Sequence, residues 1–235
     1  MSEAFAAPEF FAALDARIAR YDLLQHPFYQ AWSKGELTRD DLREYASEYW
    51  HHVSAFPTYL SALHARLEDA PLRRAVLENM ADEEGFPAGR AHSDLWMDFA
   101  TGMGAESLAT RERKLQPETA ALIAHFRDAM LASPAAALAS LYTYESRVPA
   151  IARTKAEGLK QHYSADAATA RYFTLHQTAD VHHASVWRTA IEAELTAHPE
   201  ETDVALDAAE STAAALWDTL SAVERERQQA RTGLA

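Results

Sequence analysis

The stretch His176-Gln-Thr-Ala-Asp180-Val-His182-His183 is the most informative part of the sequence for predicting the fold. On a helix with about 100° per residue, positions 176, 180 and 183 fall within roughly 60° of one another, whereas His182 points away. Two imidazoles and a carboxylate aimed at one point are typical of a metal-ligand set. A polar helix face holding three such residues would show the same spacing, so both interpretations stay open. A metal site requires further ligands from other segments.

Two other segments supply candidate ligands, Glu83 and His92 in the stretch 81–92 and Glu145 in the stretch 141–149. Glu145 lies in an apolar helical pattern, where an ionised and unpaired carboxylate would cost several kcal/mol. If Glu83, Glu145 and Asp180 converge, they need matching positive charge, and two divalent cations would supply four charges against three. This comparison favours a two-metal centre over a set of salt bridges.

The composition limits the kind of protein. The chain has 235 residues, of which 48% are apolar, and a net charge of -13. We expect one domain over residues 1–235, and no nucleic-acid partner, because such binding depends on Lys and Arg. There is no cysteine, so histidine and carboxylate ligands remain, and these suit iron or manganese. The N-terminus has no signal-peptide pattern and there is no run of about 18 apolar residues, so we expect a soluble, cytoplasmic protein without a membrane segment.

The periodicity predicts an all-α protein without strands. Ser133 and Pro134 mark one helix start, and Thr38 to Asp41 resemble a capping box. No long linker divides the chain. The last ten residues, 226–235, are polar and we expect them to fray or be disordered. Seven helices are predicted, near residues 8–20, 38–67, 71–101, 116–131, 134–158, 165–197 and 200–228.

Four separated segments carry a resemblance to a known family. They are His26-Pro-Phe-Tyr29-Gln-Ala-Trp-Ser-Lys-Gly-Glu-Leu-Thr, Ala55-Phe-Pro-Thr-Tyr-Leu-Ser-Ala-Leu-His, Tyr144-Glu-Ser-Arg-Val-Pro-Ala-Ile-Ala-Arg-Thr-Lys155 and His176 to His183. Together they resemble the CADD-like proteins, named after the chlamydial protein associating with death domains. That family belongs to the heme oxygenase-like di-metal oxidases, which share a seven-helix fold with the TenA and PqqC proteins. The likeness runs from about residue 10 to residue 197.

The resemblance implies a ligand set, a reaction and two reacting residues. It implies that two metal ions, Fe2, Mn2 or mixed Fe/Mn, use dioxygen and a reductant to make 4-aminobenzoate, a folate precursor, and it leads us to expect a homodimer. Tyr29 matches the tyrosine that is sacrificed and Lys155 the proposed amino donor; without the resemblance both would be ordinary core or surface residues. The implied metal ligands are Glu83, His92, Glu145, His176, Asp180 and His183.

Two further tyrosines are candidates for a catalytic role. Tyr144 adjoins Glu145, and Tyr172 lies four residues before His176, so both are placed to line a metal pocket. Tyrosines beside an oxidising metal can relay electrons, although most aromatic residues at helical spacing belong to the core.

The chain departs from the family pattern between Glu83 and His92. In the family the corresponding residues are seven apart, whereas here they are nine apart and would lie on opposite faces of a regular helix. Gly85, Pro87 and Gly89 offer the means for a break, a bulge or a loop. Glu84 competes with Glu83 as the ligand, and the preceding residues favour Glu83.

Other classes of function stay open. The fold would also suit another di-metal oxidase acting on a small-molecule substrate, or a thiaminase-like or cofactorless relative. The lack of cysteine removes the thiol nucleophile of a thiaminase, and a cofactorless enzyme would not need the acidic residues. A non-catalytic helical interaction protein would be expected to expose an apolar helix face, which the charged residues around Arg66 and Arg74 do not favour.

Overall fold

A computed structural model describes residues 5–233, and within that range the chain is helical and has no strand, as the all-α prediction requires. Short 3-10 helices lie at Leu23–Gln25 and Pro199–Glu201. The α-helices are α1 (Ala7–Ala19), α2 (Pro27–Ser33), α3 (Arg39–His64), α4 (Ala70–Glu83), α5 (His92–Gly102), α6 (Ser107–Arg111), α7 (Pro117–Leu131), α8 (Pro134–Glu145), α9 (Val148–His162), α10 (Arg171–His176), α11 (Ala179–Ala197) and α12 (Thr202–Thr232).

The predicted count of seven helices is wrong. Three predicted helices are each divided in two: 71–101 into α4 and α5, 134–158 into α8 and α9, and 165–197 into α10 and α11. The short helices α2 and α6 lie in segments predicted to be loops. The final helix reaches Thr232, so the segment 226–232 is helical and not frayed as predicted, while residues 234 and 235 lie outside the described residues.

Two of the three breaks have a local cause in the backbone. Gly85 follows α4 with a φ of +71°, a conformation that L-residues with side chains rarely adopt, and begins the turn that leads to α5. Pro149 lies in the first turn of α9, where its missing N–H costs nothing. Neither glycine nor proline lies at the third break, around Thr178, whose φ and ψ of -124° and -39° depart from the helical values.

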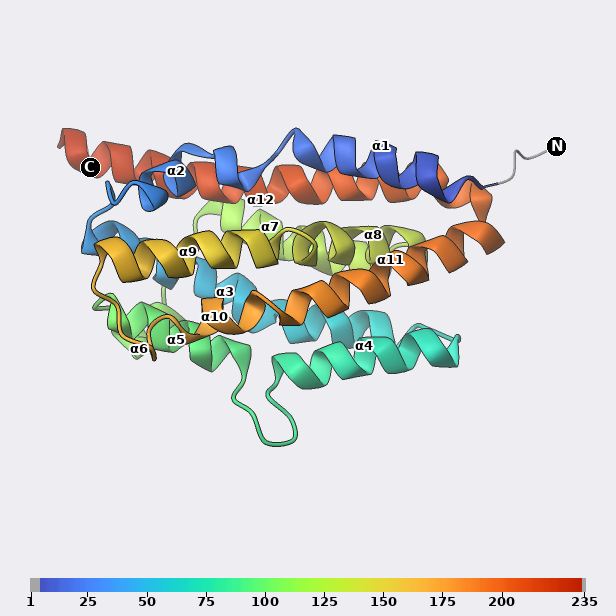
Figure 1. The fold of residues 1–235 in the computed structure, drawn as a ribbon, viewed down its shortest axis with the longest axis horizontal. Coiled ribbons are helices and arrows are strands. Elements are labelled where there is room, and N and C mark those ends of the chain that lie inside the picture. The colour runs from blue at the N-terminus through green and yellow to red at the C-terminus, as the bar shows by residue number, and fades with distance from the viewer. Residues whose placement is uncertain (1–4, 234–235) are drawn as a thin grey trace.

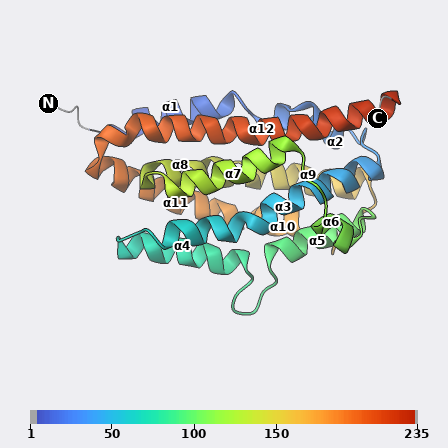
Figure 2. The ribbon, with the colours of Figure 1, turned by 180° about the vertical axis from the view of Figure 1, so that it is seen from behind.

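The helices form an elongated bundle in which α1 and α12 lie side by side along one edge (Figure 1). The inner side of α12 packs on α7 and α8, and α8 packs in turn on α11. The view from behind shows α3 crossing toward α4 and α5 at the opposite edge (Figure 2). Among the helices of residues 5–233, none has both the length and the apolar character needed to span a bilayer.

The core consists of two apolar clusters that meet near the middle of the bundle. One contains buried side chains of α1, α7, α8, α11 and most of α12, with Trp187 among the largest. The other contains side chains of α2, α5, α9 and α10, including Trp32 and Trp96. Helix α3 contributes to both, through Phe56 to the first and Val53 to the second. The candidate site, which contains polar side chains, lies where these two apolar clusters meet.

Candidate metal centre

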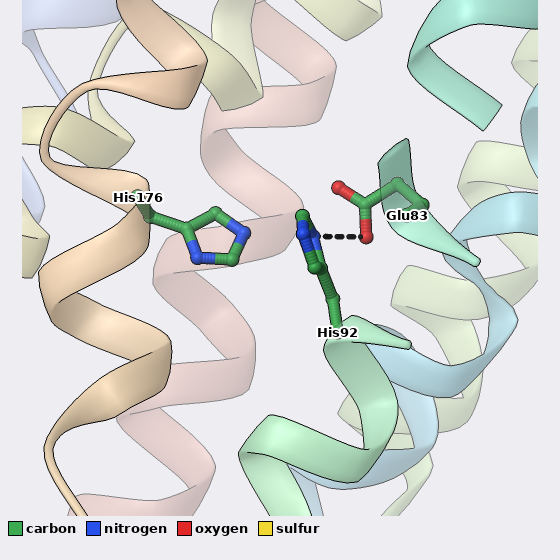
Figure 3. Close-up of side chains that lie close together, drawn as sticks. All are labelled: Glu83, His92 and His176. Carbon is green, nitrogen blue, oxygen red and sulfur yellow. Dashed lines mark ion pairs between the residues drawn. The ribbon is translucent and has the colours of Figure 1, made fainter. Parts of the chain in front are cut away.

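Glu83, His92 and His176 form the first cluster of candidate ligands. Glu83 is the last residue of α4, His92 the first of α5 and His176 the last of α10, and their side chains point toward one another (Figure 3). One ligand atom from each lies within 4.8 Å of the others. The distance from His92 Nδ1 to Glu83 Oε2 is 2.9 Å, and the His92 and His176 ring centres are 4.5 Å apart. All three side chains are buried, and the helix break at Gly85 allows residues 83 and 92 to meet.

Glu145, Asp180 and His183 form the second cluster, again with one ligand atom each within 4.8 Å of the others. Glu145 ends α8, while Asp180 and His183 lie in the first turns of α11. His183 Nδ1 lies 3.4 Å from Asp180 Oδ1 and 4.0 Å from Glu145 Oε1. All three side chains are buried.

This arrangement corrects the starting argument about positions 176, 180 and 183. They do not share one helix face, because the break at 177–178 separates α10 from α11. His176 belongs to the first cluster, and Asp180 and His183 belong to the second. The structure thus brings the six predicted residues together in two sets of three. Glu84 is exposed and belongs to neither set, so the geometry favours Glu83.

A small cavity, called here the metal cavity, joins the two clusters. Its walls include Glu83 and His176 from the first cluster and Glu145 and Asp180 from the second. Val53 and Phe56, which belong to different core clusters, complete part of the wall. The two candidate ion positions are therefore neighbours within one enclosed space.

The chemistry of these side chains fits two cations. Three carboxylates are buried together, and within residues 5–233 their recorded ion pairs involve histidine but neither Lys nor Arg. His92 Nδ1 and His183 Nδ1 are buried and, among the described residues, lack a hydrogen-bond partner despite their close carboxylates. Both atoms are aimed into the clusters. The clusters thus combine carboxylates that have no Lys or Arg partner with imidazole nitrogens that have no hydrogen-bond partner. Divalent iron or manganese is bound by such ligands.

Residues around the clusters hold these donors in place. His176 Nδ1 lies 2.7 Å from the carbonyl oxygen of Tyr172, so Nδ1 donates there and Nε2 is left as the lone-pair donor. The Asn79 amide donates to Glu145 Oε1 at 2.9 Å, and the Trp187 indole donates to Oε2. Asp82 Oδ2 lies 3.2 Å from His183 Nε2. Asn79, Asp82 and Trp187 were not predicted from the sequence. Asn79 and Trp187 lie one helical turn from Glu83 and His183, but that spacing alone does not distinguish them from packing residues.

The second cluster is electrostatically strained. Burial, together with the charge of Asp180, raises the pKa of Glu145 to about 8. Burial alone would lower the pKa of His183, but the close Asp180 carboxylate and the charge of Glu145 raise it to about 9. A cation between them favours an ionised carboxylate and a neutral imidazole, so its binding is expected to release protons.

Tyr29 and Lys155 lie in a second cavity, called here the Lys155 cavity, which also opens toward the surface. Their side chains meet through Tyr45: the Tyr45 hydroxyl lies 2.5 Å from Lys155 Nζ and 3.1 Å from the Tyr29 hydroxyl. Lys155 Nζ also lies 4.4 Å from the centre of the Tyr29 ring. Nothing in the sequence distinguishes Tyr45 from the other aromatic residues of α3.

Lys155 is 5% exposed, and it forms no ion pair with any residue in the range 5–233. Five aromatic rings face its amine at 4.4 to 5.6 Å, among them Tyr45, Trp96 and Phe173. Such contacts favour the charged amine, whereas the transfer of an ammonium ion from water into the protein interior disfavours it. Burial prevails and lowers the pKa of Lys155 well below its usual range.

Tyr144 and Tyr172 belong to the walls of both cavities. Tyr172 stacks on the His176 ring with ring centres 4.0 Å apart, and Tyr144 directly precedes Glu145. Burial raises the pKa of both phenols well above the usual range, so both stay protonated. They are the side chains that separate the metal cavity from the Lys155 cavity.

Comparison with known proteins identifies the family to which this chain belongs. Residues 43–217 match the family model described as iron-containing redox enzyme. The 4-aminobenzoate synthase of Chlamydia pneumoniae is 38% identical over 88% of this chain and 92% of its own length. The 4-aminobenzoate synthase of Nitrosomonas europaea is also 38% identical, over 89% of each chain. A solved structure from Shewanella denitrificans with a heme oxygenase-like fold superposes with a TM-score of 0.81 at 16% identity, covering 97% of this chain and 96% of that one.

Proposed function

Because the chain belongs to the family of iron-containing redox enzymes that includes the CADD-like 4-aminobenzoate synthases, and is thus an oxidase, we propose that it makes 4-aminobenzoate from its own Tyr29 with Lys155 as amino donor. One observation carries the proposal. The Tyr29 and Lys155 side chains meet in a cavity that shares two wall residues, Tyr144 and Tyr172, with the metal cavity.

In this proposal each cluster holds one divalent ion, iron or manganese, through three side chains. Three protein ligands per ion leave coordination positions for dioxygen. When bound and reduced, the two ions supply oxidising power by activating dioxygen. The residues around the clusters fix the donors: Asn79 and Trp187 orient the Glu145 carboxylate, and Asp82 holds the His183 ring.

The carbon skeleton of Tyr29 already contains that of the product. Its ring carries Cβ para to the phenol oxygen, so cleavage beyond Cβ leaves the carbon that becomes the carboxyl group. Exchange of the phenol oxygen for nitrogen completes 4-aminobenzoate. The phenol oxygen leaves as water, and the Cε–Nζ bond of the lysine breaks with Cε left as an aldehyde, so that the nitrogen stays on the ring. Breaking the Cα–Cβ bond and converting Cβ to a carboxylate is a further oxidation. Dioxygen accepts the electrons that Cβ and Cε lose, which is why the reaction needs an oxidant.

Lys155 is placed to supply the nitrogen. An amine attacks only when it is neutral, and the burial that lowers the pKa of Lys155 shifts its amine toward the neutral form. Its hydrogen bond to the Tyr45 hydroxyl, which in turn contacts the Tyr29 hydroxyl, keeps the amine beside the phenol carbon that must exchange its oxygen. Tyr45 therefore positions the two reacting side chains.

Tyr144 and Tyr172 are proposed to carry electrons between the metal cavity and Tyr29. Tyr172 is buried and Tyr144 is partly buried, and each lies in the wall between the two cavities. A phenol can give up an electron and its proton together when a neighbouring group accepts the proton. The Tyr144 side chain partly opposes the effect of burial on the pKa of Tyr172, and this proximity would provide a route for that proton.

The experiment begins with protein loaded anaerobically with iron and manganese, then reduced and exposed to air. We expect 4-aminobenzoate by mass spectrometry, and an equivalent loss of mass from the chain. Tyr29→Phe is expected to abolish the product, while Tyr142→Phe, which alters a buried tyrosine outside both cavities, is expected to retain it.

A second candidate is an external small-molecule substrate, favoured by the opening of the Lys155 cavity to the surface. Protein made with ring-labelled tyrosine distinguishes the two. Labelled product assigns the substrate to the chain, whereas unlabelled product, or undiminished product from Tyr29→Phe, rules out Tyr29 as the source. Product formed at the same rate after removal of both metals would overturn the oxidase mechanism itself.

A further inference from the structure

The Lys155 cavity extends beyond the two reacting side chains, because residues of α1, α8, α9 and α12 also line it. Its inner end is aromatic, with Tyr49, Trp96 and Phe173 among its walls. Its outer end lies between α1, α9 and α12, where Ile18, Val148 and Leu216 line it. An aromatic, partly enclosed space of this kind is typical of a site for a small ligand.

Among the described residues, two basic side chains line this cavity, one at each end. Lys155 is buried at the inner end, and Arg147 is exposed at the outer end. Arg147 Nη2 lies 3.9 Å from Asp15 Oδ1, and both side chains are about half exposed. An ion pair at that distance and exposure contributes little, so the guanidinium is available to another anion. Asp22, the acid that also lines the outer end, accepts a hydrogen bond from the Leu24 amide.

We propose that the Lys155 cavity binds a para-substituted benzoate, with the ring between the aromatic walls and the carboxylate paired to Arg147 at the mouth. This inference rests on the proposed function and deepens it, because such a ligand is the product of that reaction. Guanidinium pairs with a carboxylate through two parallel hydrogen bonds, which gives direction as well as affinity.

The position of Arg147 gives the pairing a role in product release. A benzoate formed at the inner end carries a negative charge in an apolar space, where the Lys155 nitrogen has been consumed and offers no counter-charge. Arg147 is then the cation remaining among the described lining residues. Its place at the exposed end draws the carboxylate outward and favours departure through the mouth between α1 and α9.

The proposal is tested by adding 4-aminobenzoate to the unreacted, metal-free chain and measuring binding by calorimetry and by tryptophan fluorescence, since Trp96 lines the cavity. We expect 4-aminobenzamide, the uncharged analogue, to bind about tenfold more weakly, because one charge-assisted hydrogen bond is worth roughly that much. Arg147→Gln is expected to weaken 4-aminobenzoate about tenfold and to remove the preference over the amide. Arg153→Gln, a change of an exposed arginine on the same helix, serves as the matched control.

The outcomes separate this inference from the proposed function. Equal affinity for acid and amide, or an unchanged affinity in Arg147→Gln, overturns the inference even if the enzyme makes 4-aminobenzoate. Selective binding that depends on Arg147, in a protein that makes no 4-aminobenzoate, supports the aromatic-carboxylate site and rejects the self-derived product. Folding of each variant is checked by circular dichroism, and the comparison of the two ligands on the unaltered chain is independent of any substitution.

Discussion

Single residues decide the chemistry of this protein more than its fold does. Lys155 is surrounded by aromatic rings and forms no ion pair with a carboxylate within residues 5–233. Keeping a lysine charged in such a place costs free energy. Packing alone would be better served by methionine, which has a similar length and no charge. The structure therefore accepts an energetic penalty at position 155 that the proposed amino-donor role explains.

Replacement of Lys155 by methionine is expected to stabilise the metal-free protein most at low pH. The pKa of Lys155 is lower in the folded state than in the unfolded state, so between these values the unfolded chain binds more protons. Stability of the unaltered protein then rises with pH, by at most about 1.4 kcal/mol per pH unit, toward the ordinary lysine pKa. The advantage of Lys155→Met should shrink accordingly between pH 7 and pH 10, measured by urea unfolding.

The exposed Lys160 on the same helix provides the control for that measurement. Lys160→Met should leave the pH dependence unchanged. A constant difference between Lys155→Met and the unaltered protein across this pH range would contradict a lowered pKa at position 155.

The sequence could identify the proposed ligands but not their partners. Helical spacing pointed to His176, Asp180 and His183, and the apolar surroundings of Glu145 pointed to that residue, but the structure groups Glu145 with Asp180 and His183 and places His176 in the other cluster. Asn79 and Tyr45 carry no comparable signal, because an amide or a phenol at helical spacing is equally consistent with ordinary packing. Tyr29 and Lys155 came from resemblance, since nothing in their own surroundings along the chain distinguishes them.

At the scale of the elements, the predicted helices fail where the candidate ligands lie. Glu83, Glu145 and His176 each end a helix, and His92 begins one. A ligand at a helix end can turn toward a partner on another helix without following the helical repeat. The breaks at Gly85 and Pro149 could be foreseen from residue type, and the first of them was. The break at Thr178 could not, because neither glycine nor proline lies there and only tertiary packing selects it.

The turn between α4 and α5 is expected to control the first cluster. A Cβ atom on Gly85 would lie 2.3 Å from the backbone carbon of Arg90, and the φ of +71° disfavours a side chain as well. Gly85→Ala should therefore displace the turn and separate Glu83 from His92. We expect the variant, after loading with iron or manganese, to retain about one metal ion where the unaltered protein retains two, measured by elemental analysis.

Gly89→Ala, within the same turn, is the matched control. Its Cβ would lie 3.3 Å from the Gly85 carbonyl oxygen, a contact that a small movement relieves, and its φ is not positive. Two ions in both variants would show that the turn does not hold the first cluster together.

For the whole molecule, composition and periodicity were sufficient for the fold class. Few glycines, no strand alternation and long apolar repeats predict a helical bundle, and residues 5–233 form one. That residues 1–235 make a single domain stays a prediction. The sequence did not show that the core would form two clusters with the candidate ligands where they meet, because that arrangement depends on which helices pack together.

A buried histidine, His52, also lies where the two apolar core clusters meet. It is expected to make the protein sensitive to acid. His52 is 0% exposed, and its Nε2 lacks a partner among the described residues. Burial lowers its pKa to about 3, only partly opposed by the charge of Glu83. The unfolded state binds the proton first on acidification, so its contribution to stability is complete above pH 6.5 and declines as the pH falls toward 3.

We expect His52→Leu in metal-free protein to flatten the loss of stability between pH 6.5 and pH 4, an effect on the order of several kcal/mol at most. Urea unfolding at each pH measures it. His198→Gln, which alters an exposed histidine, is the control. An equally steep decline in His52→Leu would assign the acid sensitivity to other groups.

The burial of Tyr29 has a consequence for the protein after it has reacted. Its ring is 5% exposed and packs on Phe28 and Tyr45 within the second apolar cluster. Under the proposed chemistry, loss of that ring leaves a void like that of an aromatic residue cut back to alanine, which costs about 3 to 5 kcal/mol. Natural domains are stable by only about 5 to 15 kcal/mol, so a spent chain would unfold more often and be degraded sooner than a fresh one. The same residue would then supply the product and set the lifetime of the protein that made it.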